Sequence, residues 1–258
     1  MAVVSIGGLK VRVDQALVDR GLCESRAQAQ RAIMAGQVRV NGHPSKKASD
    51  LVRAADQVQL LEVDRYVGRG GHKLEHALKH FALDVTGARC VDLGSSTGGF
   101  TDCLLQHGAS RVWAVDVGTN QLVWKLRSDS RVVSLEQTNA RNLTPASFGP
   151  NWALCDVVVA DCSFISLRRI LPAAAKLLRP GGSVIALVKP QFEAGKADVD
   201  LGEGVITDPA IHARVLVELE KFVSAELASL RWGGMVESPL LGPAGNKEFL
   251  VLLQPVIL

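Results

Sequence analysis

Two short runs in the second half of the chain, at 157–160 and 184–188, contain only apolar residues. Each has the length of a β-strand, and neither alternates with polar side chains as a strand with one solvated face does. Strands that are apolar on both faces are typical of a parallel sheet covered by helices on both sides. We therefore expect a doubly wound α/β fold.

The other elements follow from the same patterns. Strands are expected at 90–94, 112–116, 131–136, 156–161, 183–189 and 248–253, and helices at 100–106, 166–178 and 208–229. If the last strand runs antiparallel to its neighbours, it begins at the edge where the parallel strands end. Ligands bind at that edge in open α/β sheets, so the functional residues are expected there.

The loop after the first expected strand combines an acid with small residues. It reads Asp92-Leu93-Gly94-Ser95-Ser96-Thr97-Gly98-Gly99, and Asp116 ends the next strand. A nicotinamide or flavin dinucleotide site requires the spacing G-x-G-x-x-G, whereas the spacing here is G-x-x-x-G-G. Asp92 would repel a pyrophosphate but suits the cationic amino-acid end of S-adenosylmethionine, and Asp116 suits ribose hydroxyls. The loop therefore favours S-adenosylmethionine over a dinucleotide.

Basic residues concentrate near the N-terminus. Residues 10–60 contain nine Lys or Arg and five Asp or Glu, an excess of four positive charges, while the whole chain has a net charge of +3. A basic head on a near-neutral body is typical of a protein with a polyanionic partner. Nine bases can also simply keep a surface soluble, so the charge alone leaves both interpretations open.

The order of elements in this head is more specific. Helices are expected at 13–18 and 26–34, with Ser25 as an N-cap, and a strand at 38–40 runs into an Asn-Gly turn. The run VRVDQALVDRGLCESRAQAQRAIMAGQVRVNG resembles the S-four type RNA-binding domain, a small α+β fold. The resemblance implies a surface that meets phosphates and RNA shape. Its residues would be Arg12, Arg26, Gln30, Arg31 and Lys47.

Seven motifs of the body occur together in one enzyme family. VDLGSSTGGFTDCLL resembles the first motif of class I methyltransferases, in the version used by ribose-methylating RNA enzymes of the FtsJ type. The other six are RYVGRGGHKLEHAL, AVDVGTNQL, QTNARNL, DCSFISL, LVKPQFEAG and GNKEFLVLL. Together they resemble the TlyA family of 2'-O-ribose rRNA methyltransferases, several of which are labelled hemolysins. The resemblance implies a Rossmann-like domain that uses S-adenosylmethionine to methylate cytidine 2'-hydroxyls, with ribosomal RNA or ribosomal subunits as partner.

The same resemblance assigns roles to single residues. The catalytic set is Lys73, Asp161, Lys189 and Glu248. The donor site comprises Asp92, Gly94, Ser95, Ser96, Gly98, Gly99, Asp116, Asn139, Ala140 and Asp161, with Thr138 near the adenine and Ser163 and Phe164 beside the reacting group.

The chemistry explains why such a catalytic set is needed. A ribose 2'-hydroxyl is a poor nucleophile, so the enzyme must align its oxygen with the methyl group and help its proton leave. A free lysine is protonated at neutral pH. Lys73 and partial burial disfavour the charged form of Lys189, whereas Asp161 and Glu248 favour it. The sequence leaves open whether Lys189 is the base or an orienting group.

Two segments have two interpretations each. Residues 63–69 are expected to link an S-four type domain of residues 1–62 to a methyltransferase domain of residues 70–258. Tyr66 in this linker either stacks on RNA or packs between domains. The glycine-containing loop from 191 to 209 is either a lid over the donor or RNA, or a surface excursion.

Several classes of site and function are not expected. Five cysteines, an odd number without a C-x-x-C pair, argue against disulfides or a zinc site and for a reducing cytoplasm. His72, His76 and His80 fit surface positions on one helix, so we expect no metal. No apolar run approaches the roughly 18 residues of a membrane span, which argues against a membrane-lytic protein, and no signal peptide is expected. A non-catalytic RNA-binding module is the other alternative. We expect a monomer or a weak homodimer.

Overall fold

The computed structural model describes residues 10–61, 64–150 and 152–256. The chain divides into two compact units, Met1–Asp64 and Arg65–Leu258. Residues 1–9 and 62 of the expected N-terminal domain, and residue 63 of the expected linker, lie outside the described residues. The rest of that linker after Asp64 belongs to the second unit.

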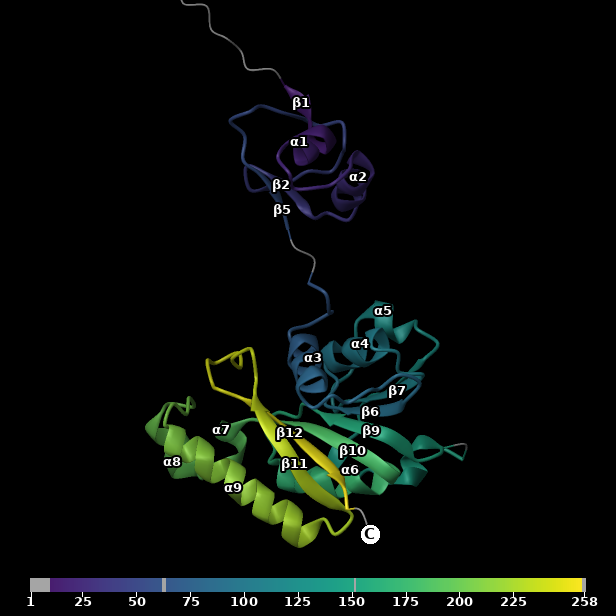
Figure 1. Cartoon of the computed structure of the whole chain (residues 1–258), viewed down its shortest axis with the longest axis vertical. Helices are drawn as coiled ribbons and strands as arrows, with labels where there is room; N and C mark the ends of the chain where they lie inside the picture. The colour runs from purple at the N-terminus through teal and green to yellow at the C-terminus, as the bar shows by residue number, and fades with distance from the viewer. Residues whose placement is uncertain (1–9, 62–63, 151, 257–258) are drawn as a thin grey trace, which may run out of the picture. The chain divides into compact units, whose positions relative to one another are not determined.

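The first unit is a small α+β domain (Figure 1). Its elements are β1 (Val11–Arg12), α1 (Val13–Asp19), α2 (Arg26–Met34), β2 (Val38–Val40), β3 (His43–Pro44), β4 (Leu51–Val52) and β5 (Val58–Leu60). β1 pairs with β4, and β3, β2 and β5 form an antiparallel sheet. The Ser25 hydroxyl accepts a hydrogen bond from the Gln28 N–H at 3.3 Å and so caps α2, as predicted. Val13, Leu17 and Ile33 fill the core between the helices and the strands.

The second unit is built on a seven-stranded sheet in the order β11-β12-β10-β9-β6-β7-β8. The strands are β6 (Arg89–Leu93), β7 (Arg111–Val115), β8 (Val132–Leu135), β9 (Cys155–Ala160), β10 (Leu178–Val188), β11 (Leu230–Glu237) and β12 (Phe249–Pro255). β6 to β10 are parallel, whereas β12 runs antiparallel to β10, and β11 antiparallel to β12. The doubly wound α/β prediction is confirmed.

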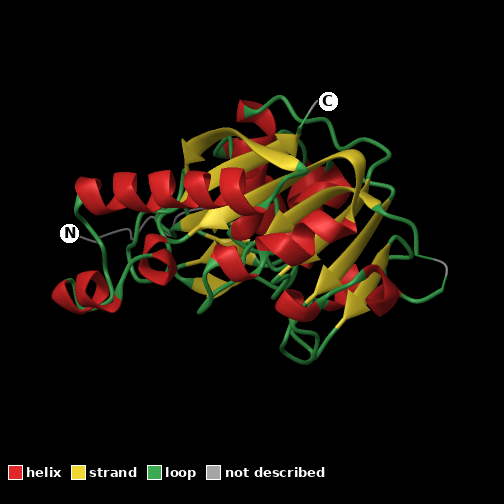
Figure 2. Ribbon diagram, turned by 90° about the horizontal axis from the view of Figure 1, so that it is seen from below, coloured by secondary structure: helices red, strands yellow, loops and turns green. Residues whose placement is uncertain are grey.

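Helices cover both faces of this sheet (Figures 1 and 2). They are α3 (Gly70–His80), α4 (Gly99–Gln106) and α5 (Trp124–Arg127) on one face, and α6 (Leu171–Leu177) and α9 (Pro209–Glu226) on the other; the short helices α7 (Pro190–Glu193) and α8 (Lys196–Leu201) follow β10. In β9, Val157 and Val159 pack on the α3–α4 side, and Val158 and Ala160 on the α6–α9 side. Both faces are therefore dry, which explains why this strand is apolar throughout.

Two regions differ from the expectations. The helix expected at 166–178 is a 3₁₀ turn, Leu167–Arg169, followed by α6, and a proline lies in the first turn of α6. The edge strand β11 was missed, because Gly233 and Gly234 in its middle weaken the strand pattern. The structure accommodates them with a register shift between Trp232 and Gly234 against β12.

Candidate active site

The carboxyl ends of four parallel strands meet at one edge of the second unit's sheet. Each leads into a polar segment: 94–98 after β6, Asp116 after β7, Asp161 after β9 and Lys189 after β10. Glu248 directly precedes β12. Because Val188 pairs with Phe249 in antiparallel register, β12 begins at this same edge. The antiparallel orientation assumed from the sequence is correct.

Two cavities at this edge share a border. The first has a volume of about 360 Å³, and its lining includes Lys73, Asp161, Lys189 and Glu248 together with Ser95, Gly99 and Pro243. The second has a volume of about 480 Å³, and its lining includes Asp116, Thr138, Asn139, Ala140 and Ile165. Gly94, Ser96, Asp161 and Ser163 line both. Cavities of this size are typical of small-molecule sites.

The first cavity contains two lysine–acid pairs. Lys73 on α3 donates a hydrogen bond to Glu248 Oε2, and both side chains are buried. Lys189 Nζ lies 2.6 Å from Asp161 Oδ1 and donates a hydrogen bond to Ser163 Oγ at 2.8 Å. The other oxygen of Glu248, Oε1, is buried and has no hydrogen-bond partner in the described part of the chain. The structure thus brings together the four residues that the sequence proposes as catalytic.

Asp116 organises the border of the second cavity. Its carboxylate accepts hydrogen bonds from the N–H groups of Ser96 at 2.8 Å and Gly118 at 2.7 Å. These bonds tie the loop after β6 to the loop after β7. Gly94 (φ +82°) lies where the loop after β6 crosses the end of β9, and a Cβ there would be 2.7 Å from the Asp161 carbonyl oxygen. This position requires glycine for both its backbone angle and its space.

Two of the proposed donor residues, Asp92 and Gly98, do not line either cavity. Asp92 is fully buried, accepts a hydrogen bond from the Thr101 hydroxyl at 2.7 Å, and lines neither cavity. Burial in the central strand raises the pKa of Asp92 to about 7. Gly98 also lines neither cavity, because it packs against Leu122 and Leu126. The other proposed donor residues line one cavity or both: Gly94, Ser95, Ser96, Gly99, Asp116, Asn139, Ala140 and Asp161.

The segment 65–69, expected as a linker, is part of the site. Tyr66 is buried in the core of the second unit, which favours packing over stacking on RNA. The Val67 N–H donates a hydrogen bond to Asp102 at 2.9 Å, and Gln106 donates one to the Arg65 carbonyl at 2.8 Å. Gly68 and Arg69 line the first cavity. Gly71 packs directly against Tyr66, since an added Cβ at Gly71 would lie 2.2 Å from the Tyr66 side chain.

The loop from 191 to 209, interpreted from the sequence as either a lid or a surface excursion, is hydrogen-bonded to the rest of the unit near both of its ends. Glu193 on α7 accepts hydrogen bonds from the Ser166 hydroxyl at 2.7 Å and the Leu167 N–H at 2.6 Å, and burial raises the pKa of Glu193. The Asn246 side chain bonds to the backbone of Gly204 and Ile206. No described residue from 195 to 209 lines either cavity. The structure thus gives the lid interpretation no direct support.

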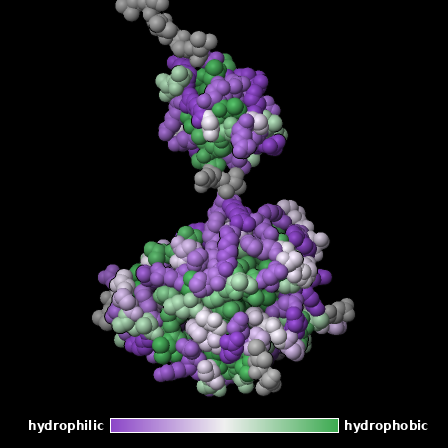
Figure 3. Space-filling view, viewed as in Figure 1, coloured by the Kyte–Doolittle hydropathy of each residue, from purple (hydrophilic) through white to green (hydrophobic). Residues whose placement is uncertain are grey.

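The residues proposed to face RNA fall into two groups: those whose side chains donate hydrogen bonds to Asp14, and those whose side chains have no partner among the described residues. Asp14, buried in the first unit, accepts hydrogen bonds from Arg12 at 2.9 Å, and from Arg26 and Gln30 at 3.0 Å. Among the described residues, the exposed side chains of Arg31 and Lys47 have no hydrogen-bond or ion-pair partner. On the face shown in Figure 3, hydrophilic residues predominate over this unit, with a few hydrophobic residues between them.

Within the described ranges, no group of three or more His, Cys, Asp or Glu could hold a metal ion. No helix among these residues is long and apolar enough to cross a bilayer. The five cysteines are free thiols, and only Cys162 is less than fully buried.

Comparison with known proteins decides the family. A family model of FtsJ-like methyltransferases matches residues 66–255, and a model of the S4 domain matches residues 11–58. The chain belongs to the FtsJ-like methyltransferase family. This methyltransferase is 46% identical over 249 residues to the 16S/23S rRNA (cytidine-2'-O)-methyltransferase TlyA of Mycobacterium tuberculosis, covering 95% of this chain and 90% of that one. The predicted TlyA-type family is therefore confirmed.

Two further relatives carry hemolysin names. The FtsJ-like methyltransferase described here is 40% identical over 241 residues to Hemolysin A of Brachyspira hyodysenteriae, covering 93% of this chain and 98% of the relative. A solved structure named as a hemolysin from Streptococcus thermophilus has a TM-score of 0.71 and 47% identity, covering 96% of this chain and 89% of that chain. The same family thus includes proteins named for rRNA methylation and proteins named for hemolysis.

Proposed function

We propose that this methyltransferase transfers the methyl group of S-adenosylmethionine to the 2'-hydroxyl of a cytidine in ribosomal RNA. The observation that carries the proposal is the meeting of the two cavities at Asp161 and Ser163, beside the lysine–acid pairs. One cavity can hold the donor while the other holds the ribose. The S4 domain and the name of the mycobacterial relative support ribosomal RNA as the substrate.

The second cavity has the groups that the donor requires. Each Asp116 oxygen is fixed by a backbone N–H and keeps a lone pair for a ribose hydroxyl. Ala140 and Ile165 provide apolar walls for a purine ring. When bound, S-adenosylmethionine supplies a methyl group activated by its sulfonium. Asp92 has a different role in this proposal: it supports the loop from beneath through Thr101.

The first cavity has the groups that a hydroxyl requires. A lysine ammonium has three N–H donors. Ser163 accepts one from Lys189, and Asp161 forms an ion pair with the same nitrogen. A remaining N–H can hold the 2'-oxygen in line for transfer. Glu248, fixed by Lys73, keeps Oε1 as an acceptor for the hydroxyl hydrogen. Alignment and proton removal therefore fall to different side chains of the same cavity.

The test uses tritiated S-adenosylmethionine with ribosomal subunits, followed by mapping of ribose methylation on the recovered RNA. Wild-type protein should label one or more cytidines at the 2'-oxygen. We expect Lys189→Ala to lower turnover by about 10²- to 10⁴-fold while calorimetry shows unchanged donor affinity. Lys176→Ala, which removes an exposed lysine of α6, is the matched control. Methyl transfer to a base, or near wild-type turnover by Lys189→Ala, would contradict the proposal.

A further inference from the structure

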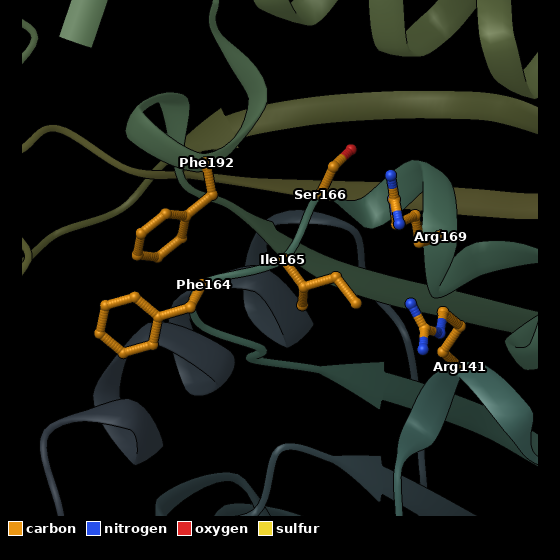
Figure 4. Close-up of a pocket in the computed structure, with 6 residues that line it drawn as sticks. All are labelled: Arg141, Phe164, Ile165, Ser166, Arg169 and Phe192. Carbon is orange, nitrogen blue, oxygen red and sulfur yellow. The ribbon is translucent and has the colours of Figure 1, made fainter. Parts of the chain in front are cut away.

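A third cavity of about 490 Å³ adjoins the second cavity, with which it shares Phe164 and Ile165. Its lining is Arg141, Phe164, Ile165, Ser166, Arg169 and Phe192, and we call it the aromatic–arginine pocket. Figure 4 shows the two phenyl rings at one end, the two guanidinium groups at the other and Ile165 between them. One end is therefore suited to a flat apolar ring and the other to an anion.

The aromatic end is unusually open. Phe164 is 90% exposed, and its backbone has φ +63°, which is rare for a residue with a large side chain. Its ring centroid lies 5.2 Å from that of Phe192, with the planes tilted by 47°. Water contact over a whole phenyl ring is unfavourable. A binding partner that covers this ring would remove the unfavourable contact with water.

The arginine end of the pocket has no acidic partner within the described residues. Arg141 and Arg169 are exposed, and neither side chain has a hydrogen-bond or ion-pair partner within the described residues. The adjacent Arg168 is different, because it donates a hydrogen bond to Glu218 at 2.9 Å. Two guanidinium groups in one pocket provide the charge and the N–H donors that a phosphate requires.

The pocket is also fixed in shape. Glu193 joins the segment that carries Phe192 to the start of the 3₁₀ turn at Ser166 and Leu167. Phe164 and Phe192 are therefore held on segments that are bonded to each other. A preformed site loses less conformational entropy on binding than a mobile one.

We infer that the aromatic–arginine pocket binds the nucleotide next to the methylated one in the substrate RNA, with its base on Phe164 and Phe192 and its phosphate on Arg141 and Arg169. None of the four candidate catalytic residues lines this pocket, so the reacting ribose belongs in the first cavity. Phe164 also lines the second cavity, and it directly follows Ser163, which lines both the first and the second cavity. The pocket therefore lies next to the place where the two cavities meet. This inference rests on the proposed function, because it takes RNA as the substrate.

The first experiment measures KM for ribosomal subunits in the tritium assay. Phe192→Leu keeps apolar bulk but removes the ring, and Arg169→Ala removes one guanidinium. Each should raise KM about ten-fold, a loss within the range for one base stack, with donor affinity unchanged. Arg168→Ala is the matched control and should change KM little. If Phe192→Leu and Arg169→Ala have the same KM for ribosomal subunits as Arg168→Ala, the inference is wrong, although the proposed function stands.

The second experiment identifies which nucleotide occupies the pocket. Fluorescein-labelled RNA hairpins carrying the mapped cytidine are made intact, or abasic at the cytidine or at either neighbour. Loss of one neighbour's base should weaken binding to wild type but not to Phe192→Leu. The same coupling at the cytidine would mean that the pocket holds the target base, and no coupling would mean that it holds none. If the wild-type protein transfers no methyl group, the proposed function is wrong.

Filter binding of total ribosomal RNA to wild type, Phe192→Leu and Arg169→Ala then shows whether the pocket binds RNA.

Discussion

Asp14 in the first unit and Asp92 in the second are both fully buried, but their surroundings differ in charge. A hydrogen bond from Arg12, followed by those from Gln30 and Arg26, holds the pKa of Asp14 well below its usual range. Burial raises the pKa of Asp92 to about 7, because hydrogen bonding from Thr101 offsets the loss of solvent only in part, and the nearby carboxylates Asp161 and Asp116 add to the rise. Asp92 lies in β6 in the middle of the larger sheet, whereas Asp14 lies in the small first unit beside arginines that are about half exposed. Depth and neighbouring cations therefore both contribute to the difference in pKa.

The two acids give opposite dependence of stability on pH. The folded pKa of Asp14 is below its unfolded value of about 3.9, so its contribution is present above pH 4 and is lost as the pH falls further. The folded pKa of Asp92 is above that value, so its contribution is complete below about pH 4 and is lost as the pH rises to about 7. Acid should thus weaken the first unit, and neutral pH the second.

The largest effect on stability is expected when a buried lysine of the second unit is left without its acidic partner. Glu248→Leu leaves Lys73 buried without its partner and should lower the free energy of unfolding by about 3–5 kcal/mol. The double variant Lys73→Met/Glu248→Leu should recover most of this loss and yet remain unable to transfer a methyl group. All four tryptophans lie in the second unit, so urea unfolding followed by tryptophan fluorescence measures this unit alone. Equal stability of the single and double variants would contradict the pairing argument.

Asp92→Asn tests the acid that has no cation. An amide cannot ionise, so the variant should remove the fall in stability of the second unit between about pH 4 and 7. That fall is at most about 1.4 kcal/mol per pH unit for one proton. The measurement is tryptophan-monitored unfolding across this range, with Asp84→Asn, at an exposed acid, as the control. A variant that keeps the wild-type slope would show that Asp92 is ionised in the folded state.

The sequence predicted six of the seven strands of the larger sheet and the edge at which the site lies, because both depend on local patterns of apolar residues. It also placed Glu248 correctly, since one assumption about strand direction was enough. It could not show that Asp92 points away from the cavities, because this depends on Thr101 of α4 packing over β6. Nor could it show the aromatic–arginine pocket, which joins Arg141 and Phe192 from segments far apart in the chain. Contacts made by tertiary packing have no local signal.

Asp14→Asn tests the acid that has cations. The change removes one negative charge, which raises the net charge of the first unit by one, but it also removes the carboxylate that orients Arg12 and Arg26. If orientation matters, RNA affinity falls despite the added charge; if charge alone matters, affinity rises. We expect a fall, together with a loss of about 1 kcal/mol in stability, since both arginines are about half exposed and solvent weakens their bonds. Filter binding and amide hydrogen exchange of α1 and α2 measure the two effects, with Asp19→Asn as the exposed control.

The smallest effects should come from basic side chains of the first unit that have no acidic partner. Arg31→Gln and Lys47→Gln each remove one unpaired charge, so each should weaken RNA binding modestly. If each side chain meets one phosphate, each should also reduce the slope of log affinity against log salt by about 0.7–0.9. Arg20→Gln is the matched control, because Arg20 donates its hydrogen bonds to the backbone carbonyls of Arg53 and Asp56 within the unit. Arg20→Gln should lower the stability of the first unit, and it should reduce the salt slope less than Arg31→Gln or Lys47→Gln does. If Arg31→Gln and Lys47→Gln leave the slope unchanged while Asp14→Asn weakens binding, the RNA contacts of this unit lie with the arginines that Asp14 holds.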